Sequence, residues 1–170
     1  MGFKDSSIFK NVEELRIQAD ILNEELIVTS GGFDPLHIGH LRCLQESAKI
    51  KNEKKYLKGK RIRVAVIVNG DEFLVNKKGK PFMKLTERME IIAGIDGVDY
   101  VVPWYDGTQT VTEALRILKP IAFTKGGDRD SSSNVPEFEL CREIGCEVIF
   151  GVGGGKIQSS SWLIESSKNE

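Results

Sequence analysis

Five short apolar segments that alternate with segments of helical pattern constrain this sequence more than any other feature. The apolar segments span residues 26–30, 62–68, 100–103, 121–125 and 147–150. Their short length and β-branched residues favour strands over helices. Strands that alternate with helices predict a parallel sheet covered on both faces, and right-handed crossovers make such a sheet doubly wound. We therefore expect an α/β chain with a Rossmann-like, five-stranded parallel sheet.

Six helices are expected around these strands. They cover residues 11–25, 37–50, 86–95, 110–118 and 136–144, and a last one begins near residue 160. The segment rich in lysine and glycine between residues 71 and 85 is expected to be a mobile connection. At 170 residues the chain fits a single domain. We divide it into an N-terminal helical extension, residues 1–25, and a main domain, residues 26–170.

Composition excludes several classes of protein. The 24 basic and 25 acidic residues give a net charge of −1, which provides no general attraction to nucleic acid or to an anionic membrane. The basic run between residues 49 and 63 is accordingly interpreted as solvated surface. No apolar run approaches the length of a membrane span and the first residues do not resemble a signal peptide, so we expect a cytoplasmic protein. The three cysteines, Cys43, Cys141 and Cys146, have no metal-binding spacing and are expected to be buried, reduced thiols.

The sequence also indicates where a ligand binds. In a doubly wound sheet, ligands bind at the carboxyl ends of the strands, where the winding direction reverses. Glycines, acids, lysines and serines follow the five expected strands, in the stretches 31–40, 69–71, 103–108, 125–130 and 151–161. The third stretch contains two aromatic residues, Trp104 and Tyr105, that are candidates for lining a substrate pocket, and packing is their alternative role.

The first of these stretches, GGFDPLHIGH at residues 31–40, contains both histidines of the chain. A glycine-containing turn that leads into a helix presents free backbone N–H groups at the positive end of the helix dipole, which suits a phosphate. His37 and His40, three residues apart at the start of that helix, are expected to lie on one face. Two imidazoles there can donate hydrogen bonds to charge that develops during phosphate transfer.

Two other roles for the histidine pair remain open. The pair can simply cap the helix. It can also bind a metal, but a closed site needs further ligands and only Asp34 is at hand in this stretch, so a metal site is disfavoured.

The pattern Gly32-Phe33-Asp34-x-x-His37-x-Gly39-His40 resembles the signature of the HxGH nucleotidyltransferases, a superfamily of cytidylyl- and adenylyltransferases. The resemblance covers about residues 26 to 165 and continues at Asn69, Asp71, Lys77, Arg88, 125–128 and 159–161. It implies that residues 26–170 form a nucleotidyltransferase domain. In this superfamily a substrate phosphate attacks the α-phosphorus of a nucleoside triphosphate and releases pyrophosphate. Such chemistry depends mainly on positioning and charge stabilisation.

The resemblance also implies roles for individual residues. Catalytic roles fall to His37, His40, Lys77 and Arg88. The resemblance assigns nucleotide binding to Gly32, Phe33, Asp34, Gly39, His40, Gly127, Asp128, Ser159, Ser160 and Ser161, and acceptor binding to Asp71, Lys77 and Lys125. Trp104 joins the acceptor-binding candidates through its position after the third strand. Lys78 and Lys80 are alternatives to Lys77, and a solvated helix arginine is the alternative for Arg88. The expected cofactor is Mg²⁺ carried by the triphosphate, with no resident metal, and a homo-oligomer is expected.

Some residues distinguish between members of the superfamily. Glycerol-phosphate cytidylyltransferases carry an arginine where this sequence has Gly154, which weakens that assignment. The stretches ELIVTSGGFD and KGGD are instead similar to those of the heptose-phosphate adenylyltransferases of lipopolysaccharide precursor synthesis. ATP and a sugar phosphate such as heptose 1-phosphate are therefore the expected substrates. A cytidylyltransferase using CTP with glycerol 3-phosphate or phosphoethanolamine, an adenylyltransferase of the nicotinamide-mononucleotide or phosphopantetheine type, and a nucleotide-binding module without turnover are the alternatives.

Overall fold

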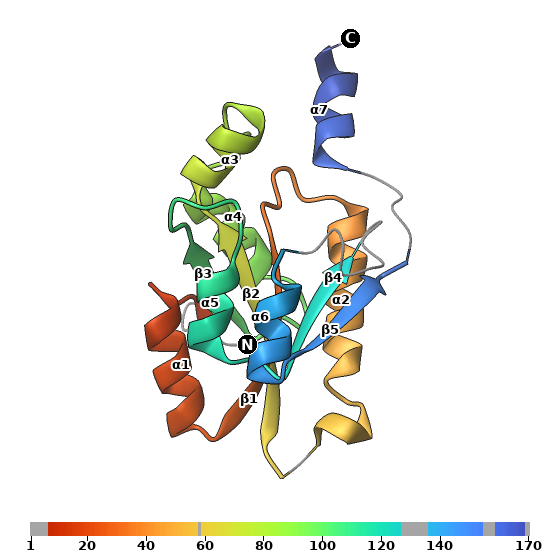
Figure 1. Ribbon diagram of the computed structural model, residues 1–170. Helices are drawn as coiled ribbons and strands as arrows, with labels where there is room; N and C mark the ends of the chain where they lie inside the picture. The colour runs from red at the N-terminus through yellow and green to blue at the C-terminus, as the bar shows by residue number, and fades with distance from the viewer. Residues whose placement is uncertain (1–6, 58, 127–135, 155–158, 169–170) are drawn as a thin grey trace.

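The computed structural model describes residues 7–57, 59–126, 136–154 and 159–168 (Figure 1). Its sheet has five parallel strands in the order β3-β2-β1-β4-β5. The strands are β1 (Glu24–Gly31), β2 (Arg61–Asn69), β3 (Tyr100–Trp104), β4 (Ala122–Gly126) and β5 (Glu147–Val152). This order confirms the expected doubly wound α/β sheet, because the chain winds in one direction from β1 to β3 and in the other from β4 to β5.

Helices cover both faces of the sheet. They are α1 (Val12–Ile21), α2 (Ile38–Ile50), α3 (Asp71–Lys78), α4 (Leu85–Ala93), α5 (Thr112–Leu118), α6 (Phe138–Ile144) and α7 (Ser160–Lys168), with a short 3-10 helix at Lys54–Tyr56. Helices α1, α5 and α6 lie on one face, and α2 and α4 lie on the other (Figure 1). Helix α7 projects from the body beyond the carboxyl ends of the strands (Figure 1).

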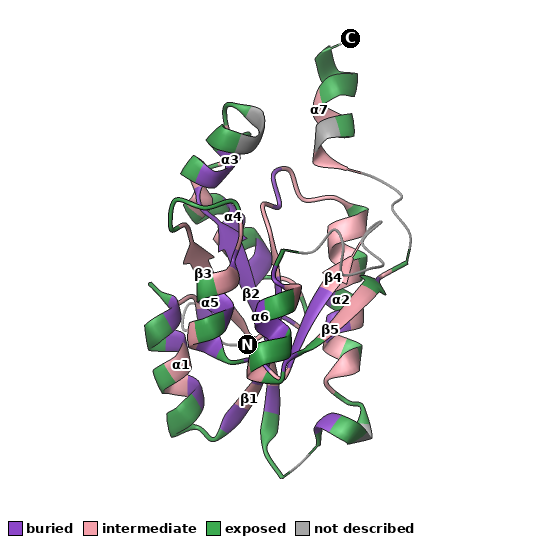
Figure 2. Ribbon diagram, viewed as in Figure 1, coloured by how far each residue is buried: buried purple, intermediate pink, exposed green. Residues whose placement is uncertain are grey.

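The core consists of apolar layers on either side of the sheet. Within β2, Ala65 and Ile67 pack against α1, α5 and α6, whereas Val64, Val66 and Val68 pack against α2 and α4. This alternation follows from the two-residue period of a strand. The central strands are therefore buried on both faces (Figure 2), which explains their nearly continuous apolar sequence.

The segment after β2 differs from the expected mobile connection, because residues 71–78 form helix α3. Gly70 is its N-cap residue, and Asp71 and Glu72 occupy the first turn, where carboxylates interact favourably with the helix dipole. Phe73 and Leu74 are buried. The lysines and glycine that suggested mobility come only at the end of the helix.

The N-terminal helix is shorter than the sequence predicts. It ends at Ile21, and Asn23 adopts a positive φ of 56°, so that Glu24 already begins β1. Val12, Leu15 and Ala19 are fully buried in the same apolar cluster as α5 and α6. The extension at residues 1–25 thus includes a helix that packs on the sheet.

Within the described ranges, no helix has the length and apolar character needed to cross a membrane.

Candidate functional site

The turn between β1 and α2 lies at the reversal point of the sheet and is tightly held. A Cβ atom on Gly32 would come within 2.8 Å of the Leu74 side chain, so α3 packs directly on this turn. Phe33 adopts a positive φ of 53° and is buried. The buried Asp34 carboxylate accepts hydrogen bonds of 2.6 Å from the backbone N–H groups of Phe82 and Met83. The turn therefore has a conformation fixed from several sides.

The two histidines stack at the N-terminus of α2. Their ring centroids are 3.7 Å apart with an interplanar angle of 22°, and the Phe33 ring lies edge-on to His40. His37 Nδ1 accepts from the Gly39 N–H at 3.1 Å, and His40 Nδ1 accepts from the His37 N–H at 3.2 Å. Because each Nδ1 is an acceptor, each neutral imidazole carries its proton on Nε2.

This arrangement combines two of the roles considered for the pair. The Nδ1 atoms cap the helix, while the Nε2–H groups are of the kind that donates to a phosphate oxygen. The described residues include no group of three or more His, Cys, Asp or Glu side chains arranged to hold a metal ion.

Arg88 on α4 is fully buried beneath this turn. Its Nη1 donates to the carbonyl oxygens of Gly32 at 2.9 Å and Asn69 at 2.6 Å, and its Nη2 donates to the Asp71 carboxylate at 2.6 Å. Its Nε donates to the Met83 carbonyl oxygen. The solvated alternative for Arg88 is therefore wrong. One guanidinium thus connects the ends of β1 and β2 with the start of α3. Through these contacts Arg88 holds the histidine turn and the segment after β2 in place.

Helix α7 begins against the same turn. Ser160 Oγ donates to the Pro35 carbonyl oxygen at 2.8 Å, and Ser159 Oγ accepts from the Trp162 N–H at 3.1 Å. The N-termini of α2 and α7 thus approach the same turn, although they are more than a hundred residues apart in sequence. Of the remaining nucleotide-binding candidates, Gly127 and Asp128 lie outside the described residues, as does the side chain of Ser161.

The acceptor-binding candidates lie along the carboxyl edge of the sheet. Trp104 ends β3 beside Asn69 of β2, and Asp71 follows two residues later. The Lys125 ammonium on β4 lies 5.2 Å from the centroid of the Phe123 ring. Lys77 belongs to α3, but its side chain is outside the described part of the structure.

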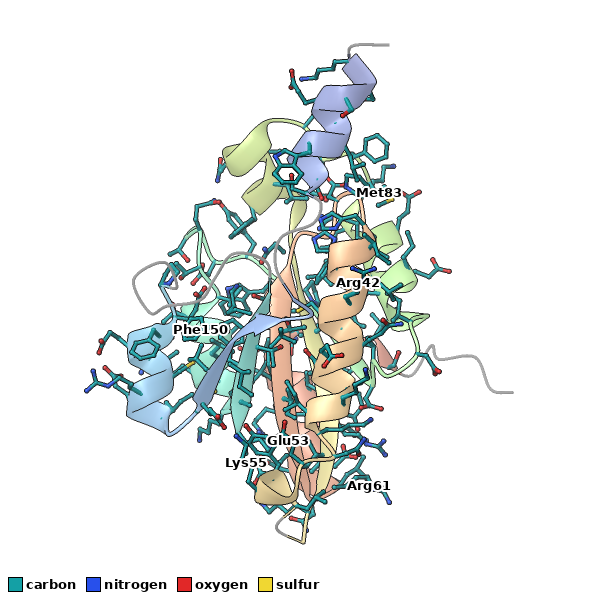
Figure 3. All side chains as sticks on the ribbon, turned by 90° about the vertical axis from the view of Figure 1, so that its right-hand side faces the viewer. Arg42, Glu53, Lys55, Arg61, Met83 and Phe150 are labelled. Atoms are coloured by element: carbon teal, nitrogen blue, oxygen red, sulfur yellow. The ribbon has the colours of Figure 1, made fainter. Side chains whose placement is uncertain are left out.

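A cavity of about 560 Å³ lies between α2 and β5. Figure 3 labels Arg42 on α2 and Phe150 on β5, which line it. The other lining residues are Gln45, Glu46, Ile50, Ile149, Gly151, Val152, Gly153 and Gly154. No motif in the sequence singles out Arg42, although it lies on the same helix as His40 and only two residues after it.

Cys43 lies on α2, three residues after His40. Burial raises the pKa of the Cys43 thiol, and the nearby Lys125 charge and hydrogen bonds from Thr29 and Ser47 only partly oppose this effect. All three cysteines are free thiols, as expected, but only Cys141 and Cys146 are buried, because Cys43 on α2 is partly exposed.

Comparison with known proteins identifies the family of this chain. The cytidylyltransferase-like family model matches residues 28–152. The bifunctional protein HldE of Hahella chejuensis is 31% identical over 148 residues, which is 84% of this chain and 27% of that protein. The HldE protein of Desulfatibacillum aliphaticivorans is 29% identical over 165 residues, 94% of this chain and 31% of that protein. The chain thus spans less than a third of the length of either relative.

A solved structure shares the fold. It is the lipopolysaccharide core biosynthesis protein from Thermoplasma volcanium, with a TM-score of 0.56 and 24% identity over 79% of this chain and 97% of that chain. These matches confirm the resemblance inferred from the HxGH pattern.

Proposed function

Because this chain belongs to the cytidylyltransferase-like family, we propose that it is an enzyme that transfers a nucleoside monophosphate from ATP to a sugar phosphate such as heptose 1-phosphate. The observation that carries this proposal is the stacked pair His37 and His40 at the N-terminus of α2. The HldE relatives support a nucleotidyltransferase acting on sugar phosphates.

In the proposed reaction an oxygen of the acceptor phosphate attacks the α-phosphorus of MgATP. The new P–O bond forms as the bond to the bridging oxygen of pyrophosphate breaks, and pyrophosphate leaves with its electron pair. Positioning and charge stabilisation are sufficient for such a step. Mg²⁺ arrives with the triphosphate as part of the substrate and offsets its charge.

The protein supplies hydrogen-bond donors for this step. We assign the Nε2–H groups of His37 and His40, with the backbone N–H groups at the start of α2, to the phosphates of the nucleotide. Ser159, Ser160 and Ser161 at the start of α7 would bind the triphosphate from the other side. Lys77, which the family resemblance assigns to the phosphates, would add a positive charge from α3. Gly127 and Asp128 would contact the ribose and base.

Arg88 acts differently in this proposal. All three of its guanidinium nitrogens donate hydrogen bonds to protein atoms, so we assign it a positioning role. We assign the nucleoside to the cavity between α2 and β5, which has Arg42 at its wall.

Gly154 favours ATP over CTP as the nucleotide. In the glycerol-phosphate cytidylyltransferases an arginine occupies the corresponding position. Here Gly154 has a φ of +92°, a conformation that arginine adopts only with strain. The backbone at this position is therefore not suited to an arginine.

Measurement of pyrophosphate release tests the proposal. ATP and CTP are each combined with heptose 1-phosphate, glycerol 3-phosphate, phosphoethanolamine, nicotinamide mononucleotide and phosphopantetheine, with Mg²⁺ present. Release with ATP and the sugar phosphate is the expected result. Release only with another pair would contradict the assigned substrates, and nucleotide binding without any release would favour a binding module without turnover.

A further inference from the structure

Two buried polar atoms at the carboxyl edge of the sheet have no hydrogen-bond partner within the described part of the structure. They are the side-chain oxygen Oδ1 of Asn69, at the end of β2, and the indole nitrogen Nε1 of Trp104, at the end of β3. The Asn69 residue is only 6% exposed. Buried polar groups are nearly always hydrogen-bonded, so two unpaired atoms in one place require an explanation.

The two side chains are neighbours on one face of the sheet. Asn69 and Trp104 are register partners of adjacent strands, and the Gly70 N–H donates to the Trp104 carbonyl oxygen at 3.0 Å. Trp104 packs on the apolar cluster that contains Ile67 and Val102. Since side chains two residues apart in a strand lie on the same face, Asn69 shares the face of Ile67 and therefore of Trp104.

This pair lies directly beside the histidine turn. Arg88 Nη1 donates both to the Gly32 carbonyl oxygen at 2.9 Å and to the Asn69 carbonyl oxygen at 2.6 Å. A single nitrogen atom therefore joins the turn that leads to His37 with the residue that carries the unpaired amide. Helix α2, with the histidines, covers the opposite face of the sheet. A molecule that contacts Asn69 and Trp104 thus approaches the phosphate site from the face opposite to α2.

We infer that Asn69 and Trp104 bind a hydroxyl group of the acceptor and so select a polyhydroxylated phosphate, such as a sugar phosphate, over an amino or alkyl phosphate. This inference rests on the proposed function. The Asn69 oxygen only accepts a hydrogen bond, and the Trp104 N–H only donates one. A hydroxyl group does both, so one hydroxyl, or two adjacent ones, can satisfy the pair.

Other acceptor chemistries leave part of the pair unsatisfied. A protonated amine, as in phosphoethanolamine, can donate to Asn69 but cannot accept from Trp104, and an alkyl chain can do neither. A site that forms hydrogen bonds with a substrate hydroxyl strongly rejects analogues that lack it, because its own polar groups then stay unpaired.

The test compares three variants with the unaltered protein. Trp104→Phe removes the N–H but keeps an aromatic ring, and Asn69→Leu removes the oxygen while roughly keeping the volume. Asn52→Leu is the matched control, because it makes the same exchange as Asn69→Leu at an exposed residue just after α2, away from the carboxyl edge of the sheet. For each protein, pyrophosphate release gives KM and kcat for heptose 1-phosphate, calorimetry gives the nucleotide Kd, and urea unfolding gives the midpoint.

The inference predicts that the KM for the sugar phosphate rises about tenfold or more in Trp104→Phe and Asn69→Leu. The control, the nucleotide Kd and the unfolding midpoint of Asn69→Leu should stay close to those of the unaltered protein, because an unpaired group contributes no hydrogen bond to the free fold. An unchanged KM with a lowered midpoint would overturn the inference, since the two side chains would then only stabilise the fold.

A second measurement needs no variant. In the unaltered protein, kcat/KM for heptose 1-phosphate should exceed that for phosphoethanolamine and for propyl phosphate by at least about tenfold. Comparable values for all three would overturn the hydroxyl selection while leaving the transferase proposal intact. Absence of pyrophosphate release with any acceptor would overturn the proposed function itself, so the two failures are distinct.

Discussion

The two ring nitrogens of His40 have different tasks. Its Nδ1 accepts from the His37 N–H and so helps to cap α2, whereas its Nε2–H is assigned to the phosphates. We expect His40→Ala to keep the fold but lose about 10²-fold or more in kcat, because a donor to transition-state charge is removed. Pyrophosphate release measures kcat, and unchanged release would contradict the assigned role. His40→Asn keeps an acceptor near the Nδ1 position, so its thermal midpoint should exceed that of His40→Ala while its activity stays low.

Arg88 combines full burial with four hydrogen bonds to protein atoms. Lysine cannot reproduce this planar set of donors, so Arg88→Lys should lower the free energy of unfolding by about 3 kcal/mol. Urea unfolding measures the loss. The control is Arg116→Lys at a half-exposed surface pair with Glu113, where a change below about 0.5 kcal/mol is expected. Equal losses in the free energy of unfolding for the two variants would mean that the buried hydrogen bonds of Arg88 do not stabilise the fold.

The sequence predicts contacts between residues that are close along the chain, but it does not predict the contacts of site residues whose partners come from separate segments. His37, Gly39 and His40 lie in one turn and the first residues of one helix, so their spacing alone predicts that they meet. The burial of Arg88 depends on three separate segments. No local pattern shows that its partners are the carbonyl oxygens of Gly32 and Asn69. The same applies to the Asn69 and Trp104 pair, which exists only through the register of β2 and β3.

At the scale of elements, the contact between β5 and α2 depends on one glycine. A Cβ atom on Gly153 would lie 2.7 Å from the Cys43 backbone nitrogen and 2.9 Å from the Arg42 carbonyl carbon. We expect Gly153→Ala to lower the free energy of unfolding by about 1–3 kcal/mol more than Gly151→Ala. Gly151 is the matched control because it also has a positive φ, but a Cβ there meets nothing within 4 Å. Denaturant unfolding of both variants measures the difference, and equal losses would exclude a close approach at Gly153.

The position of α7 depends on Ser160, whose hydroxyl donates to the Pro35 carbonyl oxygen. Ser160→Ala should let α7 leave this turn more often, and amide hydrogen exchange in α7 should become about fivefold faster without nucleotide, the effect of losing about 1 kcal/mol. The control is Ser167→Ala, because Ser167 Oγ donates to Ile164 within the same helix. If both variants exchange alike, the bond to Pro35 does not hold the helix.

The elements themselves were largely predictable, since all five strands appear within two residues of their expected bounds. Strand length, β-branched residues and alternation with helices carry that information locally. The missed helix α3 shows the limit of this approach. The lysines of this segment suggested a mobile connection. Phe73 and Leu74 are nevertheless buried, and Leu74 contacts the histidine turn, because of tertiary packing that the local sequence does not show.

Across the whole molecule, the carboxyl edge of the sheet holds the candidate site and the amino edge holds a set of ion pairs. At the amino edge, Tyr100 donates to Glu24 and Tyr56 donates to Glu147. Arg63 also binds Glu24, at 2.7 Å. Tyr56 and Tyr100 therefore lie at the edge opposite to the proposed chemistry, where they can be altered without contact with substrate.

These phenols give the fold a dependence on alkaline pH. Burial first, and then the hydrogen bonds to Glu147 and Glu24, raise the pKa of both Tyr56 and Tyr100 to about 12. An unfolded tyrosine loses its proton near pH 10, so between about pH 10 and 12 the unfolded chain binds fewer protons than the folded one and stability falls as pH rises. The contribution is fully present below pH 10. We expect a loss of about 1–2 kcal/mol for each phenol across this interval.

The double variant Tyr56→Phe, Tyr100→Phe has no such protons to lose. Its free energy of unfolding should be lower than that of the unaltered protein at pH 9, and it should fall less between pH 10 and 12. Urea unfolding at several pH values measures both slopes, and phenolate absorbance of the folded protein should show two groups that titrate near pH 12. Parallel slopes for the two proteins would contradict this origin of the alkaline loss. A smaller slope in the double variant would place the main alkaline sensitivity of the fold at the amino edge, separate from any pH dependence of turnover.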